Sequence, residues 1–146
     1  MTWLTTQTLL SWCATLLGDT DRAGRLYALL LPHRERTVQD LLAANWGSVE
    51  RYLGSLAMVR GECTRAEEHF EAALARNADN AQALRLTRME YAQLLLATHQ
   101  SARARALLAV ALDDAQAAGL TAVADFIRVQ LSPRAPSDPP PRPEWS

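Results

Sequence analysis

The chain contains no lysine, and all fifteen of its basic residues are arginines. Mechanisms that require a lysine, such as a Schiff base or a Walker-type phosphate loop, are therefore excluded. The arginines are balanced by sixteen acidic residues, which gives a formal net charge of −1. Because no field of one sign surrounds the chain, neither nucleic acid nor an anionic membrane surface is an expected partner.

Long apolar runs are missing as well, and none reaches the ~18 residues that a membrane-spanning helix requires. The N-terminal stretch lacks the positive region of an export signal, because no arginine precedes Arg22. Bulky Trp12 also stands where a lipoprotein cleavage box needs a small residue. The two cysteines, Cys13 and Cys63, make a poor disulfide framework and are expected to be reduced. These features predict a cytoplasmic protein.

Strand signals are scarce, since alanine, leucine, arginine and glutamate dominate and β-branched residues are sparse. A chain of 146 residues that is 49% hydrophobic fits one domain able to bury a core. Gly, Asn, Asp and Pro divide an all-α chain into helices expected over residues 3–17, 21–31, 47–60, 64–76, 81–99, 102–118 and 121–131.

Capping residues support these limits. The side chains of Asp19 to Asp21 and of Asp79 to Asn80 can accept hydrogen bonds from the free N–H groups that open a helix. Thr64 with Glu67 has the spacing of a capping box. Three glycines can take the left-handed turn that ends a helix, namely Gly18, Gly61 and Gly119. The segment "TVQDLLAAN" is ambiguous, because it fits either a short helix or an extension of the helix that follows.

Six of the seven prolines follow Leu131. Residues 133–146 are nearly free of apolar side chains apart from Trp145, so they cannot offset their ordering entropy by burial. We expect a disordered Pro-rich tail over 133–146 and a helical domain over 1–132. The motif "PPPRP" is either an SH3-type ligand or plain tail, and Trp145 is either a docking residue or a passenger.

Small and large residues recur along the chain at similar spacings. Gly61, Ala66, Phe70, Ala73 and Leu74 recur as Gly18, Ala23, Tyr27, Leu30 and Leu31, and more loosely as His99, Ala104, Leu108, Ala111 and Leu112. In a helix-turn-helix repeat, two helices cross closely where each carries a small residue, and a larger residue fills the space between pairs. Gly54 and Ala66 are predicted to make the close approach, with Phe70 and Leu74 as filler.

This pattern resembles a divergent tetratricopeptide repeat (TPR), with offsets of 43 residues from Gly18 to Gly61 and 38 from Gly61 to His99. The consensus tryptophan is absent, because its places hold Gln7, Glu50 and Arg88. The resemblance implies an all-α, right-handed, TPR-like solenoid of about three helix pairs, closed by a C-terminal capping helix.

From about Leu9 to Phe126 the chain also resembles the C-terminal helical-repeat region of bacterial signal-transduction ATPase regulators, which carry adenylate-cyclase or LuxR-type output domains. The successive segments "GSVERYLGSLA" and "AEEHFEAAL" carry this resemblance. It implies a protein-interaction scaffold without catalysis. The chain has neither a GxxxxGK[ST] loop nor a cyclase domain. The ATPase and output functions are therefore expected either to belong to another protein, a regulator or ATPase that is a candidate partner, or to have been lost.

In such repeats the first helix of each pair faces a concave groove. The predicted inward positions are Thr8, Leu9, Trp12 and Leu16, then Arg51, Tyr52, Ser55 and Met58, then Met89, Glu90, Gln93 and Leu96. Aromatic, Met and Arg side chains are the mixture expected of a partner-binding surface. The alternative is that the same residues form the core or meet a capping helix.

The last predicted helix has Val123, Phe126, Ile127 and Leu131 on one face. It either caps the final pair or swaps between subunits, which would make a homodimer.

Candidates for chemistry are few. His33 lies in a loop, His69 in the charged, solvated face "EEHFE", and His99 at a helix end, and none shares a metal-ligand spacing with another. Cys63 has no activating neighbour in sequence. We expect no catalytic residue, no metal and no cofactor. Two hypotheses remain: a regulatory protein-binding scaffold, or a small all-α ligand carrier or biosynthetic enzyme with an apolar pocket around Trp12, Tyr52 and Met58.

Overall fold

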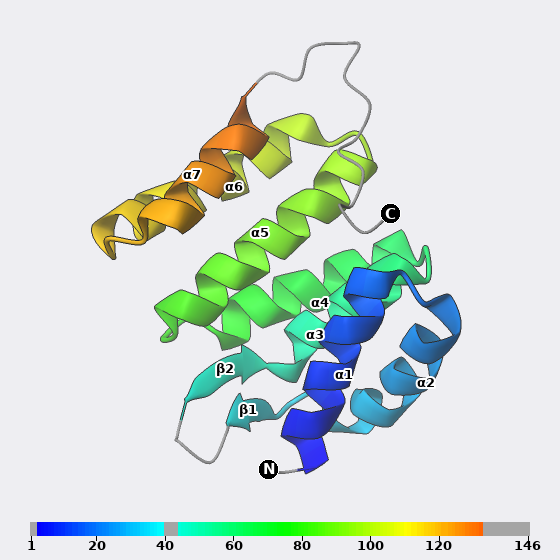
Figure 1. Ribbon diagram of the computed structural model, residues 1–146. Coiled ribbons are helices and arrows are strands. Elements are labelled where there is room, and N and C mark those ends of the chain that lie inside the picture. Colours follow the sequence, from blue (N-terminus) through cyan, green and yellow to red (C-terminus); the bar gives the residue numbers. More distant parts are fainter. Residues whose placement is uncertain (1–2, 40–43, 133–146) are drawn as a thin grey trace.

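The computed structural model describes residues 3–39 and 44–132 (Figure 1). This part of the chain is mostly helical, which confirms the all-α expectation at the level of class. The α-helices are α1 (Trp3–Leu17), α2 (Thr20–Leu30), α3 (Val49–Val59), α4 (Cys63–Arg76), α5 (Ala81–Ala97), α6 (Ser101–Ala117) and α7 (Thr121–Leu131). A 3-10 turn, η1 (Leu31–His33), and two short strands, β1 (Thr37–Gln39) and β2 (Asn45–Ser48), complete it.

The predicted helix limits agree with the observed ones to within two residues, and local chemistry explains the ends. Asp19 accepts from the Arg22 N–H and Asn80 from the Ala83 N–H, as predicted. Gly18, Gly61 and Gly119 all have positive φ, and His99 takes the same conformation, with φ 61°, after α5. The capping box was wrong, because α4 begins at Cys63 and Glu62 stands at its N-cap without a side-chain hydrogen bond.

A β-hairpin corrects the helical interpretation of the segment after η1. Thr37 pairs with Ser48, Val38 with Gly47, and Gln39 with Asn45 in an antiparallel ladder. The remainder of that predicted helix, residues 40–43, lies outside the described residues. Val38 is buried, so the strand has one face on the protein.

Gly47 fixes where the hairpin meets the helices. Its φ is 90°, and a Cβ there would stand 2.6 Å from the Ala83 Cβ and 3.0 Å from Asn77 Oδ1. Both facts favour glycine strongly over any other residue. Asn77 Oδ1 also accepts from the Ser48 N–H at 2.8 Å, which ties the strand to the end of α4.

Each helix packs against the next along the chain, and α3 also contacts both α1 and α5 (Figure 1). Strand β1 contacts α1, and β2 contacts α3, α4 and α5. The core follows these contacts, with fully buried side chains from α3 to α7 that include Leu53, Leu56, Phe70, Tyr91, Leu95, Leu108 and Ile127.

Gly54 of α3 closely approaches α4 as predicted, but the side chain nearest to it is Phe70 and not Ala66. A Cβ at Gly54 would lie 2.9 Å from Cδ1 and Cε1 of Phe70, so the ring of Phe70, rather than Ala66, fills the space that the glycine leaves. Phe70 in turn stacks on Tyr91, with ring centroids 5.5 Å apart. The predicted filler residue therefore also serves as the close contact within the α3–α4 pair.

Candidate functional site

Two adjoining cavities lie between α1, α3 and α5, with volumes of about 270 Å³ and about 320 Å³. They share five lining residues, which are Trp12, Arg51, Tyr52, Leu86 and Glu90. We call the two cavities together the groove. Its floor comes from α3, and its walls come from α1 and α5.

Different elements line the two ends of the groove. At one end lie Val38 and Trp46 from the hairpin, beside Thr5 of α1 and Gln82 of α5. At the other end lie Leu16 of α1, Gln93 of α5 and Phe126 of α7, with Met58 of α3. The hairpin is thus part of the site, because β1 and β2 contact α1 and α5 at this end.

All but one of the predicted inward residues line the groove. They are Thr8, Leu9, Trp12, Leu16, Arg51, Tyr52, Ser55, Met58, Met89, Glu90 and Gln93. Leu96 is exposed and lines neither cavity. That these residues bind a partner stays a prediction.

Sequence reasoning missed eight of the lining residues, of which Leu86, Trp46 and Phe126 have the largest apolar side chains. Leu86 could have been found, since it precedes Met89 and Glu90 by one helical turn. Trp46 could not, because it reaches the groove only through the unpredicted hairpin. Phe126 was assigned to the face of α7 that packs on its neighbours, whereas half of its surface is exposed.

Helix α1 has an inverted distribution of side chains. Its buried residues are the small or polar Thr5, Thr8, Ser11 and Ala14. Its exposed residues include Trp3, Leu9, Leu10, Trp12, Leu16 and Leu17. A helix that buries its hydroxyls and exposes its leucines and tryptophans leaves apolar surface for contacts outside the fold.

Arg51 and Glu90 form a shielded ion pair in the groove. Arg51 Nη1 lies 2.7 Å from Glu90 Oε1, and Ser55 Oγ donates to Glu90 Oε2 at 3.2 Å. The Arg51 guanidinium also lies over the Tyr52 ring, 4.3 Å from its centroid. Burial raises the pKa of Glu90, although the charge of Arg51 acts against that rise. The pKa of Tyr52 is raised by burial too.

One hydrogen-bond donor in the groove is unused. The Arg51 side chain is only 7% exposed, and within residues 3–39 and 44–132 its Nε–H has no acceptor. A buried N–H without a partner costs about 1–3 kcal/mol, more when the group is charged. This nitrogen has almost no accessible surface, so a groove ligand would reach it only if the Arg51 side chain rotated.

A second polar cluster lies away from the groove and corrects the sequence interpretation of His69. His69 was expected on a solvated face, but it is only 5% exposed. Its Nδ1 lies 2.5 Å from Glu50 Oε2, its Nε2 lies 2.8 Å from the Tyr27 hydroxyl, and Glu50 Oε1 accepts from Arg34 Nε at 2.8 Å. The side-chain polar atoms of Tyr27, Glu50 and His69 all have partners. None of these residues lines the groove, and the cluster joins α2, α3 and α4.

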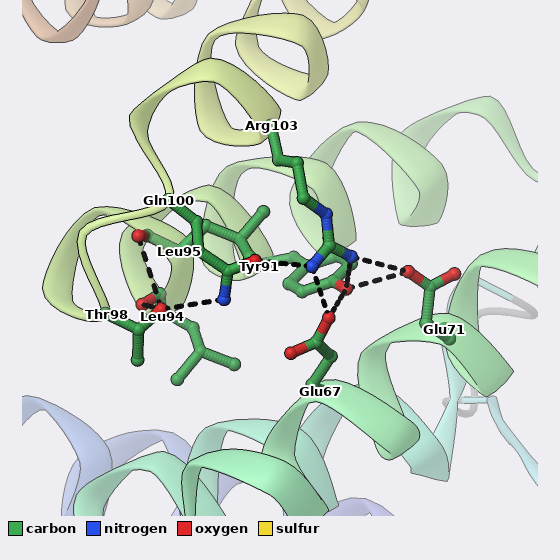
Figure 2. A network of polar contacts seen from close by, with 8 residues as sticks. All are labelled: Glu67, Glu71, Tyr91, Leu94, Leu95, Thr98, Gln100 and Arg103. Carbon is green, nitrogen blue, oxygen red and sulfur yellow. Dashed lines mark hydrogen bonds and ion pairs between the residues drawn. The ribbon is translucent and has the colours of Figure 1, made fainter.

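A third cluster, centred on Tyr91, joins α4, α5 and α6 (Figure 2). The Tyr91 hydroxyl accepts from Arg103 Nη2 at 2.7 Å and lies 2.7 Å from Glu71 Oε1 and 3.0 Å from Glu67 Oε1. Arg103 Nη1 also donates to Glu67 and to Gln100. Burial and the two carboxylates raise the pKa of Tyr91, whereas the hydrogen bond from Arg103 lowers the pKa of Glu67.

Within the part of the chain that the structure describes, no group of three or more His, Cys, Asp or Glu residues could hold a metal ion. In the same part, no helix combines the length and apolarity needed to cross a bilayer. Cys13 and Cys63 are both free and exposed. Comparison of the chain with protein-family models, curated proteins and solved structures gives no match.

Proposed function

We propose that this protein is a non-catalytic interaction module of the bacterial regulatory type, which binds a segment of a partner protein in the groove. One observation carries the proposal: aromatic, Met and Leu side chains from three helices surround a buried arginine with an unused N–H. Such a surface supplies apolar area for an anchor side chain and one directional contact to orient it.

The helix arrangement supports a divergent TPR-like solenoid as part of the same proposal. The pairs would be α1 with α2, α3 with α4 and α5 with α6, capped by α7. Consecutive helices pack together, and the first helices of successive pairs also touch, since α3 contacts α1 and α5. In this arrangement the first helix of each pair lines the groove, which is the expectation from the resemblance to ATPase regulators. The partner would then be such a regulator.

The groove chemistry favours a peptide with an apolar or aromatic anchor next to a free carbonyl. Trp12 and Tyr52 would contact the anchor side chain. The Arg51 side chain would rotate so that its Nε–H, which has no acceptor in the described residues, donates to the carbonyl oxygen. A peptide carbonyl suits this donor better than a second cation would, because Arg51 already balances Glu90.

A displayed random-peptide library, selected on the full-length protein, tests the proposal. Enriched peptides are synthesised, and their Kd is measured by calorimetry on the wild type and on Trp12→Ala. We expect the Kd to rise about tenfold or more in this variant, because truncation of an aromatic hot spot costs at least ~1.4 kcal/mol. Trp12 is 55% exposed, so its loss should leave the helices intact.

Trp3→Ala is the matched control. Trp3 lies on the same helix, is 49% exposed, and lines neither cavity. Its truncation should change the Kd by less than about twofold, which is the size of ordinary surface effects. Equal weakening in both variants, or in neither, would place binding outside the groove and overturn the proposal.

A small-molecule carrier is the second candidate, favoured by the shielded Arg51–Glu90 pair beside an apolar cavity. One cavity, at about 270 Å³, lies just below the usual range for small-ligand pockets of about 300–1,000 Å³, and the other, at about 320 Å³, lies at its lower end. Native mass spectrometry of the purified protein separates the two candidates. An adduct of constant mass that is present in the wild type and absent from Trp12→Ala would favour the carrier.

A further inference from the structure

We propose that the groove binds an aromatic side chain that carries a hydrogen-bond donor, tyrosine or tryptophan, and that the Glu90 carboxylate accepts from this donor. The inference rests on the proposed function and names the anchor side chain of the bound segment. It makes Glu90 the residue that determines which anchor the groove prefers.

Glu90 is the more accessible member of the ion pair in the groove. Of the described residues that line the two cavities, only Arg51 and Glu90 are of a charged type. The Glu90 side chain is 23% exposed, whereas that of Arg51 is only 7% exposed and has its guanidinium against the Tyr52 ring. A ligand in the groove therefore reaches the carboxylate more readily than the guanidinium.

The Glu90 carboxylate also has acceptor capacity to spare. Its two ionised oxygens can accept about four hydrogen bonds. Within the described residues it accepts two, at Oε1 from Arg51 Nη1 at 2.7 Å and at Oε2 from Ser55 Oγ at 3.2 Å. Burial raises the pKa of Glu90, because its ionised form is poorly solvated in the groove. A donor on the ligand would supply the stabilisation that water does not.

The donor on the ligand should be neutral. Arg51 already balances the charge of Glu90, so an ammonium group would add an uncompensated positive charge beside a shielded arginine. A phenol O–H or an indole N–H adds no charge. Its hydrogen bond to an ionised acceptor is still roughly twice as strong as one between two neutral groups.

The surroundings of Glu90 favour an aromatic ring as the carrier of this donor. Trp12, Tyr52 and Leu86 line both cavities together with Glu90. The cavities measure about 270 Å³ and about 320 Å³, and a protein cavity of about 150 Å³ already admits a benzene ring. A ring in either cavity would have Glu90 among its neighbours. Tyrosine and tryptophan combine a flat apolar body with a single donor.

Three small probes test the inference on the full-length protein: N-acetyl-tyrosinamide, N-acetyl-tryptophanamide and N-acetyl-phenylalaninamide. Their backbone groups are identical, so differences in Kd report the side chain alone. Probes of this size bind with a Kd of about 0.1–10 mM, which proton–nitrogen NMR titration measures. We expect the tyrosine and tryptophan probes to bind about tenfold or more tightly than the phenylalanine probe.

An apolar groove without an available acceptor predicts the opposite order. The tyrosine hydroxyl would then be buried without a partner, so phenylalanine would bind at least as well as tyrosine. The order of the probes in the wild type is therefore decisive by itself, and it requires no variant to fold.

Glu90→Gln assigns the acceptor. The change keeps the size of the side chain and removes its charge, so the ratio of the phenylalanine Kd to the tyrosine Kd should fall by at least about threefold. A purely structural effect of the substitution would weaken all three probes equally and leave this ratio unchanged. Glu68→Gln is the matched control, because Glu68 is exposed on α4 and lines neither cavity. It should change neither Kd.

Three results would overturn the inference. In the first, the phenylalanine probe binds the wild type as tightly as the tyrosine probe. In the second, Glu90→Gln keeps the wild-type ratio, so that another groove side chain such as Gln82 or Gln93 is the acceptor. In the third, none of the probes binds at about 10 mM, which would mean that the anchor is not an aromatic side chain.

The dependence of peptide binding on Trp12 separates this inference from the proposed function. Any of the three results could occur while selected peptides still bind the wild type and lose affinity in Trp12→Ala but not in Trp3→Ala. The groove would then remain a peptide site with a different anchor. Loss of the Trp12 dependence would instead remove the proposed function, whatever the order of the probes.

Discussion

Gly54 and Gly24 both lie inside helices, yet alanine should have opposite effects at the two positions. A Cβ at Gly54 would stand 2.9 Å from the buried Phe70 ring, which is itself held against Tyr91. Overpacking costs about 1–3 kcal/mol, whereas the gain in helix propensity is only about 1 kcal/mol. We expect Gly54→Ala to lower the free energy of unfolding by about 1 kcal/mol, measured by urea denaturation.

Gly24→Ala is the control variant for Gly54→Ala. The nearest atom to a Cβ at Gly24 is Arg60 Nε at 3.8 Å, an ordinary contact with a side chain that can move. Its free energy of unfolding should rise by about 0.5–1 kcal/mol, because alanine loses less conformational entropy on folding. A stabilised Gly54→Ala protein would show that the Phe70 ring can shift at little cost.

Single residues also show how far the sequence was informative. The glycine turns were predictable, since a helix end that needs positive φ selects glycine. His69 was not, because its neighbours in sequence are charged and its partners, Tyr27 and Glu50, come from other helices. The unused N–H of Arg51 is equally invisible in sequence, since it depends on which acceptors the fold brings near.

At the level of elements, the Tyr91 cluster should make the packing of α4, α5 and α6 sensitive to acid. The Arg103 hydrogen bond lowers the folded-state pKa of Glu67 below its ordinary value of 4.5. The ionised Glu67 carboxylate therefore contributes to stability above pH 4.5, and this contribution is lost as the pH falls through the folded-state pKa of Glu67. We expect Arg103→Gln to lower the urea midpoint at about pH 6, and this difference from the wild type to shrink as the pH falls below 4.5.

Arg105→Gln provides the matched comparison, because Arg105 is exposed on the same helix and has no role in the cluster. Its urea midpoint should differ from that of the wild type by a small amount that does not change with pH. If the urea midpoint of Arg103→Gln also differed from that of the wild type by an amount independent of pH, the Tyr91 cluster would make no pH-dependent contribution to stability.

The hairpin was the element that sequence reasoning missed. Thr37–Gln39 is only three residues long, too short for an alternating pattern to stand out from its surroundings. Its stability comes from distant contacts: β1 packs on α1, and the approach of Gly47 to Ala83 and Asn77 fixes β2. The seven helices were predictable because each carries its own periodicity and end signals.

For the whole molecule, the apolar face of α1 predicts concentration-dependent self-association. We expect light scattering to give a mass that rises above the monomer value of 16.1 kDa as concentration increases. Leu10→Glu should hold the protein at the monomer mass, because Leu10 is exposed on α1 and lies outside the groove.

Val129→Glu tests the alternative in which α7 forms the dimer contact, since Val129 is the most exposed apolar residue of that helix. If this variant, and not Leu10→Glu, lost the association, the contact would lie on α7. A constant monomer mass in the wild type would remove both surfaces from consideration.

The hairpin gives the groove a direction. Trp46 and Val38 line one end, while the opposite end is lined by Phe126. A polypeptide that enters beside Phe126 and follows the floor reaches the hairpin at the other end. Because the two ends of the groove are built from different elements, the two directions in which a segment could lie there are not equivalent. The site would therefore distinguish a sequence from its reverse.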